Sequence, residues 1–288
     1  MKSAPKSRDT PRWAAALAAV GAALVLAGCG PIRKPPHARP PQVNPEQLLA
    51  AHNAWAESIQ HVWARADLAL NLPADDAGAK RDRYDVGGHF FLAKPDGLFI
   101  DGDILGQTVF QFGVGGRTFW LWVKPSVNTV WVGRRGGAAE GRLIISPPAL
   151  LEALGVFRID PAAGREMTLE EFGRHAVLSE YASVRGPLVR RLWFNRDTFR
   201  PERVDLYEAG GKRLLMGEML RYERIGGTDV CTDYRIRFFT AGEVDMVVHL
   251  KDVSLTKEPN PRIFEYRRPP DAKEVDLDLP RPVAADSP

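Results

Sequence analysis

From residue 83 onward, apolar and polar residues alternate with a period of two, which is the pattern of β-strands. Segments such as RTFWLWV, NTVWVGR and LVRRLWFN follow one another, with Gly, Pro, Asn and Asp between them. No internal repeat of about 20–50 residues divides these segments. The sequence therefore predicts a mostly β (α+β) domain. Its core would be one unclosed, strongly curved antiparallel sheet of about eleven strands.

A long helix and short mid-chain helices are predicted beside the strands. Asn44 and Pro45 suit the start of a helix over 45–61. Its apolar face would consist of Leu48, Ala51, Trp55, Ile59 and Val62. Ser146 is the expected N-cap of a short helix in ISPPALLEALG, which Gly155 would end. In TLEEF, the capping-box spacing of Thr168 and Glu171 predicts another helix start.

Several strands are apolar on both faces, although a sheet with one solvated face should alternate with polar residues. In TFWLWV, Phe119 and Leu121 lie on one face, and Trp120 and Trp122 on the other. Two interpretations remain open, a thick core covered on both sides or a hydrophobic cavity that accepts acyl chains. The predicted cavity residues are Phe90, Leu92, Phe110, Phe112, Trp120, Trp122 and Trp131. The predicted lid consists of Leu150, Leu151 and Leu154.

The first 30 residues have the pattern of a bacterial lipoprotein signal. A basic segment over 1–12 precedes an uncharged apolar run over 13–28, and this run is shorter than the ~20 residues of a membrane-spanning helix. Leu26-Ala27-Gly28-Cys29 resembles the lipobox, in which the cysteine receives diacylglycerol and becomes the new N-terminus. The alternative is a plain transmembrane anchor.

We therefore expect a signal peptide over 1–28 and lipidation of Cys29, whose acyl chains would anchor the protein stably to a membrane. Gly30, in place of a retention Asp, weakly favours the outer membrane. The Pro-rich residues 29–43 would form an extended tether to a body over 44–278, with a loose tail over 279–288. The formal charge of +3 arises in the signal segment, so the body is nearly neutral and nucleic-acid binding is not expected.

The sequence carries no catalytic or metal-binding motif. None of its six histidines pair at ligand spacing, and neither H-E-x-x-H nor G-x-S-x-G occurs. DGD over 101–103 lacks the later carboxylates of a calcium loop, and GVGG over 113–116 lacks a third phosphate-loop glycine, so both predict turns. Cys231 would be an incidental residue near the surface. We expect no enzyme, no cofactor and no metal, although distant residues could still assemble a hydrolase site.

The order of these segments resembles the bacterial outer-membrane lipoprotein carrier and receptor superfamily, the LolA/LolB-like half-barrels. The resemblance covers roughly residues 44–278 and rests on VGGHFFLAKPDGLFI, VGGRTFWLWVKP, the mid-chain helix and PRIFEYRRPPDAKEVDL. It implies an eleven-stranded, unclosed half-barrel with a helical lid over a cavity for lipoprotein acyl chains. In the soluble carriers, an Arg before a Pro helps to hold the lid. Lys94 stands at the matching position before Pro95 and lacks the planar fork of Arg.

The resemblance and the lipobox together predict a lipid-anchored periplasmic binding protein, nearer to the membrane-anchored receptor than to the soluble carrier. It would be a monomer that takes acyl chains of lipoproteins or lipids, with a periplasmic carrier protein as a partner, for delivery to the outer membrane. Leu98 and Phe99 are candidates for the receptor's protruding hydrophobic loop. The alternatives are a structural or assembly lipoprotein with a filled core that binds a protein partner in the envelope, and an anchored hydrolase.

Overall fold

The computed structural model of the chain describes residues 42–71, 83–124, 127–136, 143, 145–161, 163–239 and 243–279. The predicted signal peptide, Cys29, most of the tether and nearly all of the C-terminal tail lie outside the described residues, and those predictions stand untested. Residues from Val43 onward belong to one compact unit. Among the described helices, none combines the length and the apolar composition that a membrane span requires.

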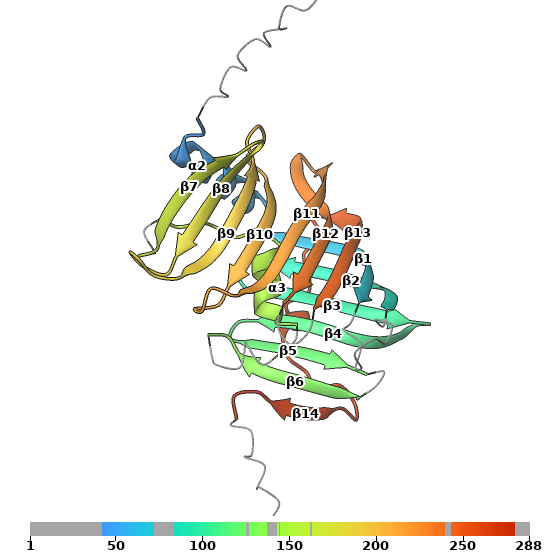
Figure 1. Ribbon diagram of the computed structural model, residues 1–288. Coiled ribbons are helices and arrows are strands. Elements are labelled where there is room, and N and C mark those ends of the chain that lie inside the picture. Colours follow the sequence, from blue (N-terminus) through green and yellow to red (C-terminus); the bar gives the residue numbers. More distant parts are fainter. Residues whose placement is uncertain are drawn as a thin grey trace, which may run out of the picture. The chain divides into compact units, whose positions relative to one another are not determined.

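Fourteen strands of the described residues form one open, curved sheet (Figure 1). The strands are β1 (His61–Asn71), β2 (Arg83–Ala93), β3 (Gly97–Ile104), β4 (Gln107–Gly115), β5 (Thr118–Val123), β6 (Thr129–Arg134), β7 (Glu166–Phe172), β8 (His175–Tyr181), β9 (Leu188–Asn195), β10 (Pro201–Tyr207), β11 (Arg213–Ile225), β12 (Thr228–Phe238), β13 (Val244–Ser254) and β14 (Lys273–Asp276). Their spatial order is β14-β6-β5-β4-β3-β2-β1-β13-β12-β11-β10-β9-β8-β7. The predicted unclosed β architecture is confirmed, with more strands than the eleven expected.

The sheet has two halves that meet where β1 pairs with β13. We call β1–β6 with β14 the first half, and β7–β13 the second half. Neighbouring strands are antiparallel except β14, which pairs with β6 in parallel. The segment YEAGGKR forms the hairpin that joins β10 to β11, where the Glu208 backbone N–H donates to the Lys212 carbonyl at 3.0 Å.

The two longer helices start at the caps that the sequence predicts. In α2 (Pro45–Ser58), the Asn44 side chain accepts hydrogen bonds from the backbone N–H groups of Glu46 and Gln47. In α3 (Pro147–Ala153), the Ser146 side chain accepts from the Ala149 backbone N–H, and Gly155 follows with φ +71°. A short 3₁₀ helix, η2, spans Pro261–Phe264. Side-chain acceptors at the first turn thus fix both helix starts.

The predicted helix at TLEEF is wrong, because these residues lie in β7. This strand pairs with β8 from Glu166–Tyr181 to Phe172–His175. Met167 and Leu169 recur with a period of two and pack against the core, so strand pairing overrides the local capping signal.

The predicted turn at 101–103 is also wrong, because DGD lies inside β3. Gly102 is needed there: a Cβ atom at this position would come within 2.2 Å of the Phe110 ring on β4. The GVGG prediction is only partly right, since Gly113 and Gly115 belong to β4 and the turn begins at Gly116. Leu98 does not protrude, because its side chain is fully buried in β3.

Cys231 is buried rather than near the surface, with 2% of its area exposed. The register between β11 and β12 shifts twice between Met219 and Tyr222, and this bulge breaks the regular alternation of faces. As a result, Cys231 packs in the core, whereas Asp233 two residues later is only half-buried. Burial raises the pKa of the Cys231 thiol to about 12.

The two faces of the sheet are covered by different parts of the chain. We call the face that carries α2 and α3 the inner face, and the opposite one the outer face. The inner-face core includes Leu98, Ile100, Phe112, Phe119, Leu150 and Phe194, all with at most 1% of their area exposed. On the outer face of β5 and β6, a second cluster contains Trp120, Trp122, Val130 and Ala272, with Phe99, Val132 and Tyr266 packed against it.

Candidate functional site

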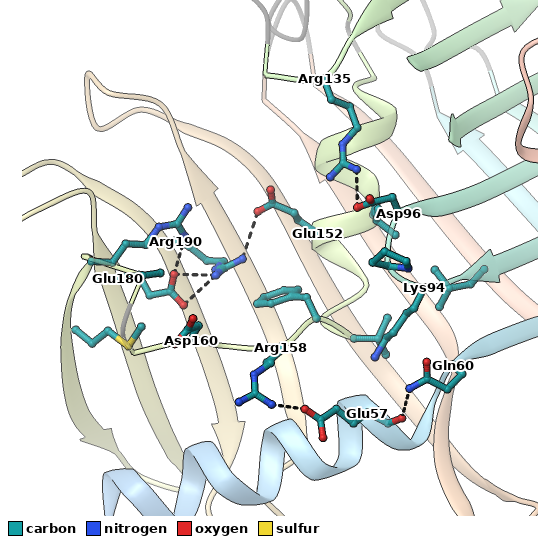
Figure 2. Close-up of a pocket in the computed structure, with 18 residues that line it drawn as sticks. Glu57, Gln60, Lys94, Asp96, Arg135, Glu152, Arg158, Asp160, Glu180 and Arg190 are labelled. Carbon is teal, nitrogen blue, oxygen red and sulfur yellow. Dashed lines mark hydrogen bonds and ion pairs between the residues drawn. The ribbon is translucent and has the colours of Figure 1, made fainter. Parts of the chain in front are cut away.

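A pocket of about 690 Å³ lies on the inner face, between the C-terminal end of α2, α3 and the strands β7–β9 (Figure 2). We call it the α2–α3 pocket. Part of its wall is apolar and consists of Leu92, Leu151, Val156, Phe157 and Met167. Most of the rest is charged, namely Glu57, Lys94, Asp96, Arg135, Glu152, Arg158, Asp160, Arg165, Glu180 and Arg190. A pocket with both kinds of wall suits an amphiphilic ligand.

One wall of the pocket is the segment after α3, which α2 holds in place. The His52 Nε2–H donates to the Phe157 carbonyl at 3.0 Å. The Asn53 side chain donates to the Ile159 carbonyl and accepts from the Ile159 backbone N–H, both at 2.8 Å. These three bonds fix the backbone that presents the Phe157 ring to the pocket.

His52 is itself buried among Trp55, Phe157 and Phe194. Burial lowers the pKa of His52 to about 4, because a charged imidazole would lose its hydration. The ring is therefore neutral near pH 7 and acts as a structural hydrogen-bond donor. It is not positioned to take part in acid–base chemistry in the pocket.

An ionic cluster forms the opposite wall. The Glu180 carboxylate on β8 is 1% exposed and accepts two hydrogen bonds from Arg190 Nη2, at 3.0 and 2.7 Å. Arg165 Nη1 donates a third bond at 2.9 Å, and Arg190 Nη1 lies 3.4 Å from Glu152 Oε2 on α3. The Arg190 guanidinium also stacks on the Phe157 ring, 3.9 Å from its centroid. A buried carboxylate is tolerated only with such partners, so this cluster links α3 to β8 and β9.

The remaining cations lie across the pocket from this cluster, as Figure 2 shows for Lys94 and Arg135. Arg135 pairs with Asp96 at 2.7 Å, and Arg158 pairs with Glu57. Lys94 Nζ instead donates to the Ala56 carbonyl near the end of α2. Burial lowers the pKa of the Lys94 ammonium. Within the described part of the chain, Lys94 is the pocket cation without a carboxylate at salt-bridge distance, so its other N–H groups can meet an anionic ligand.

The seven predicted cavity residues do not meet in one cavity. Phe90, Phe110 and Phe112 are buried in the inner-face core, Trp131 packs half-buried against the same core, and only Leu92 reaches the α2–α3 pocket. Trp120 and Trp122 lie on the outer face. Residues paired directly across two strands share a face, and here Phe112 pairs with Leu121 while Trp120 pairs with Gly113. The sequence prediction therefore combined residues from opposite faces.

The predicted lid residues also lie in two different places. Leu150 and Leu154 are buried in the inner-face core, and half-buried Leu151 lines the pocket. The α3 backbone lies directly on β11, where a Cβ atom at Gly217 would come within 2.6 Å of the Ala153 carbonyl oxygen. Lys94 contacts α2 and makes no described hydrogen bond or ion pair with α3.

Sequence reasoning missed the ionic cluster, although a signal for it exists. Glu180 follows Ala176 and Leu178 at inward positions of HAVLSEY, and Arg190 precedes Leu192 and Phe194 at inward positions of LVRRLWFN. A charged residue at an inward position of each of two adjacent strands predicts a buried ion pair.

No protein-family model matches the chain, and no curated protein matches it in sequence. Solved structures do match. A LolA superfamily protein from Nitrosomonas europaea has a TM-score of 0.50 and 16% identity, over 78% of this chain and 99% of that chain. The chain shares its fold with this LolA superfamily protein.

Two further structures have this LolA-like fold. A DUF1329 family protein from Desulfovibrio piger has a TM-score of 0.52 and 14% identity, over 77% of this chain and 97% of that chain. A Vibrio parahaemolyticus domain described as an outer membrane lipoprotein-sorting protein has a TM-score of 0.51 and 12% identity, over 75% of this chain and 94% of that chain. The resemblance read from the sequence is thus matched at the level of fold.

Proposed function

We propose that the chain is a lipid-anchored protein of the bacterial cell envelope that binds acyl chains of a lipoprotein or lipid in the α2–α3 pocket. The observation that carries the proposal is the composition of this pocket, which has an apolar wall beside the half-buried Lys94. Its volume of about 690 Å³ falls within the usual range of ligand pockets.

The acyl chain would lie against Leu92, Leu151 and Phe157, and each methylene taken from water contributes about 0.8 kcal/mol. Acidic oxygens of the head group would bind to Lys94 Nζ. No chemical step is needed, because transfer follows from the difference in burial between donor and acceptor sites. Deeper insertion requires α3 to move, since Leu150 and Leu154 fill the core beneath it.

The lipobox at Cys29 supports attachment to the membrane, and Gly30 weakly favours the outer membrane. The fold supports this assignment, because a Vibrio parahaemolyticus domain described as an outer membrane lipoprotein-sorting protein has the same fold. A soluble periplasmic carrier of lipoproteins is the partner that this proposal implies.

The test is to secrete residues 44–288 into a bacterial periplasm, purify them, extract with organic solvent and analyse the extract by mass spectrometry. We expect a stoichiometric acylated compound, which Leu151→Trp reduces at least fivefold because the indole fills the pocket. Val184→Trp is the matched control, because Val184 is 77% exposed and does not line the α2–α3 pocket. A clean extract together with no uptake of a fluorescent fatty acid contradicts the proposal.

One observation favours the second candidate, an assembly lipoprotein that binds a protein partner. Phe90, Phe112 and Phe119 are at most 2% exposed, so the protein's own side chains fill the inner face where the acyl cavity was expected. A clean extract, combined with stable capture of one envelope protein by the anchored chain, would support this candidate instead.

A further inference from the structure

Three histidines of the sheet each contact a carboxylate. His175 Nε2 lies 2.8 Å from Glu202, His249 Nδ1 lies 2.5 Å from Asp233, and His89 Nδ1 lies 3.1 Å from Asp101. Among the described residues, only the third pair has another carboxylate, Asp103, close enough to form a group of three potential metal ligands. This group lies outside the α2–α3 pocket.

Strand register brings the three side chains together on the outer face. His89 of β2 pairs with Asp101 of β3, and Gly87 pairs with Asp103. Asp101 and Asp103 are two residues apart on one strand, so their side chains project from the same face. Because His89 stands directly opposite Asp101, all three side chains converge over the β2–β3 pair.

The donor atoms lie close to one another, and the separation of one pair fits a small cation. One ligand atom from each residue lies within 4.8 Å of the other two. The 3.1 Å between His89 Nδ1 and Asp101 Oδ1 is close to the ~3.3 Å that separates two ligands of a tetrahedral ion with bonds of about 2.0–2.1 Å. The His89 backbone N–H also donates to Asp101 Oδ1 at 2.7 Å, which holds this carboxylate in position.

A second observation is independent of these distances. Asp103 Oδ1 is buried and has no hydrogen-bond partner among the described residues. A buried acceptor without a partner has lost its hydration without gaining a hydrogen bond in return, which costs free energy. A cation bound to this oxygen would remove that cost. There is also space beside Asp103, because a Cβ atom at Gly87 would meet nothing within 4 Å. This space can hold a water as a fourth ligand.

We propose that His89, Asp101 and Asp103 bind one divalent transition-metal ion. One imidazole nitrogen and two carboxylate oxygens suit zinc, whereas calcium and magnesium prefer a shell of oxygens. The ion fastens β2 to β3 from the outer face. It stabilises the folded chain in proportion to its occupancy, because the unfolded chain does not bring the ligands together.

The test uses the full-length chain without a polyhistidine tag, purified in detergent and freed of metal with a chelator. Zinc is titrated against a chromogenic competitor, and one ion per chain is expected. Asp103→Asn, which preserves side-chain shape, should weaken zinc binding at least tenfold, as should His89→Ala. The matched control is His175→Ala, which removes a histidine paired with a single carboxylate and should leave the affinity unchanged.

Thermal unfolding gives a second readout in case His89→Ala folds poorly. Zinc should raise the Tm of the wild type and of His175→Ala, but not that of Asp103→Asn. Absence of saturable binding overturns the site, as does equal zinc affinity for Asp103→Asn and the wild type. Neither result depends on whether the organic extract contains an acylated compound. The metal site and the proposed acyl-chain function can therefore be disproved independently.

Discussion

In β5 and β6 of the first half, the outer face carries Trp120, Trp122 and Val130, whereas in β9 and β10 of the second half it carries Trp193 and Asp205. The first set is covered by another part of the chain, with Tyr266 and Ala272 packed on it. The second set is covered by arginine side chains from β10 and the neighbouring β11.

Asp205 shows how the second half covers itself. This carboxylate is 1% exposed and accepts hydrogen bonds from Arg203 Nη2 at 2.8 Å, Arg213 Nη1 at 3.2 Å and Trp193 Nε1 at 3.2 Å. The Arg203 guanidinium also lies 5.3 Å from the centroid of the Trp193 ring. The two guanidinium groups thus cover Asp205 while remaining partly exposed themselves, at 30% for Arg203 and 37% for Arg213. An apolar outer face needs a separate covering segment, and an ionic one does not.

Replacing the central tryptophan of each half gives the largest expected difference. Trp120→Ala should lower the free energy of unfolding by about 3–5 kcal/mol, because it empties a buried site beneath Tyr266. Trp193→Ala should cost about 1–2 kcal/mol, because this ring is half-exposed. Urea unfolding measures both. Equal losses would mean that the two outer faces are buried in the same way.

The inner face should contribute a pH dependence of stability through the buried His52. The pKa of His52 is about 4 in the folded protein and about 6.5 when unfolded, so the unfolded chain binds the proton more tightly. His52 therefore favours folding above pH 6.5, and this contribution of about 3 kcal/mol is lost as the pH falls to 4. Chemical unfolding from pH 7 to 4 should show this loss in the wild type and a weaker slope in His52→Gln. Parallel slopes in the two proteins would assign the pH dependence to other groups.

Removing single carboxylates separates buried from exposed ion pairs in the second half. Asp205→Asn should cost about 2 kcal/mol, because Arg203 and Arg213 lose a buried anion while remaining partly exposed. Asp252→Asn on β13 should cost at most about 0.5 kcal/mol, because Asp252 and its partner Arg65 are both more than half exposed and water screens the pair. The comparison fails if the second variant loses as much stability as the first in urea unfolding.

Local signals in the sequence predict the elements well, because each depends on nearby residues. Asn44 and Ser146 cap their helices as expected, and period-two segments become strands. Errors occur where pairing with a neighbouring strand overrides a local signal, as for TLEEF in β7 and for Cys231 beside the bulge between β11 and β12. A sequence pattern shows alternation, but it does not show which neighbour a strand pairs with.

The candidate site was harder to predict for the same reason. The α2–α3 pocket combines Glu57, Lys94, Glu152 and Glu180 from four separate elements or their ends. No spacing along the chain connects such residues. The aromatic residues that looked like a cavity were divided between the two faces, because Trp120 pairs with Gly113 while Phe112 pairs with Leu121.

The β1–β13 pairing at the centre of the sheet has a consequence for folding. It joins Trp63 to Ser254, so the first strand of the domain meets the thirteenth. A chain that emerges N-terminus first can form the hairpins from β1 to β6, but the free edge of β1 stays unpaired until β13 arrives. Contacts between such distant segments form slowly, and an open strand edge invites pairing with other chains. The middle of this sheet therefore closes only after most of the chain has emerged, and until then its open edge needs protection.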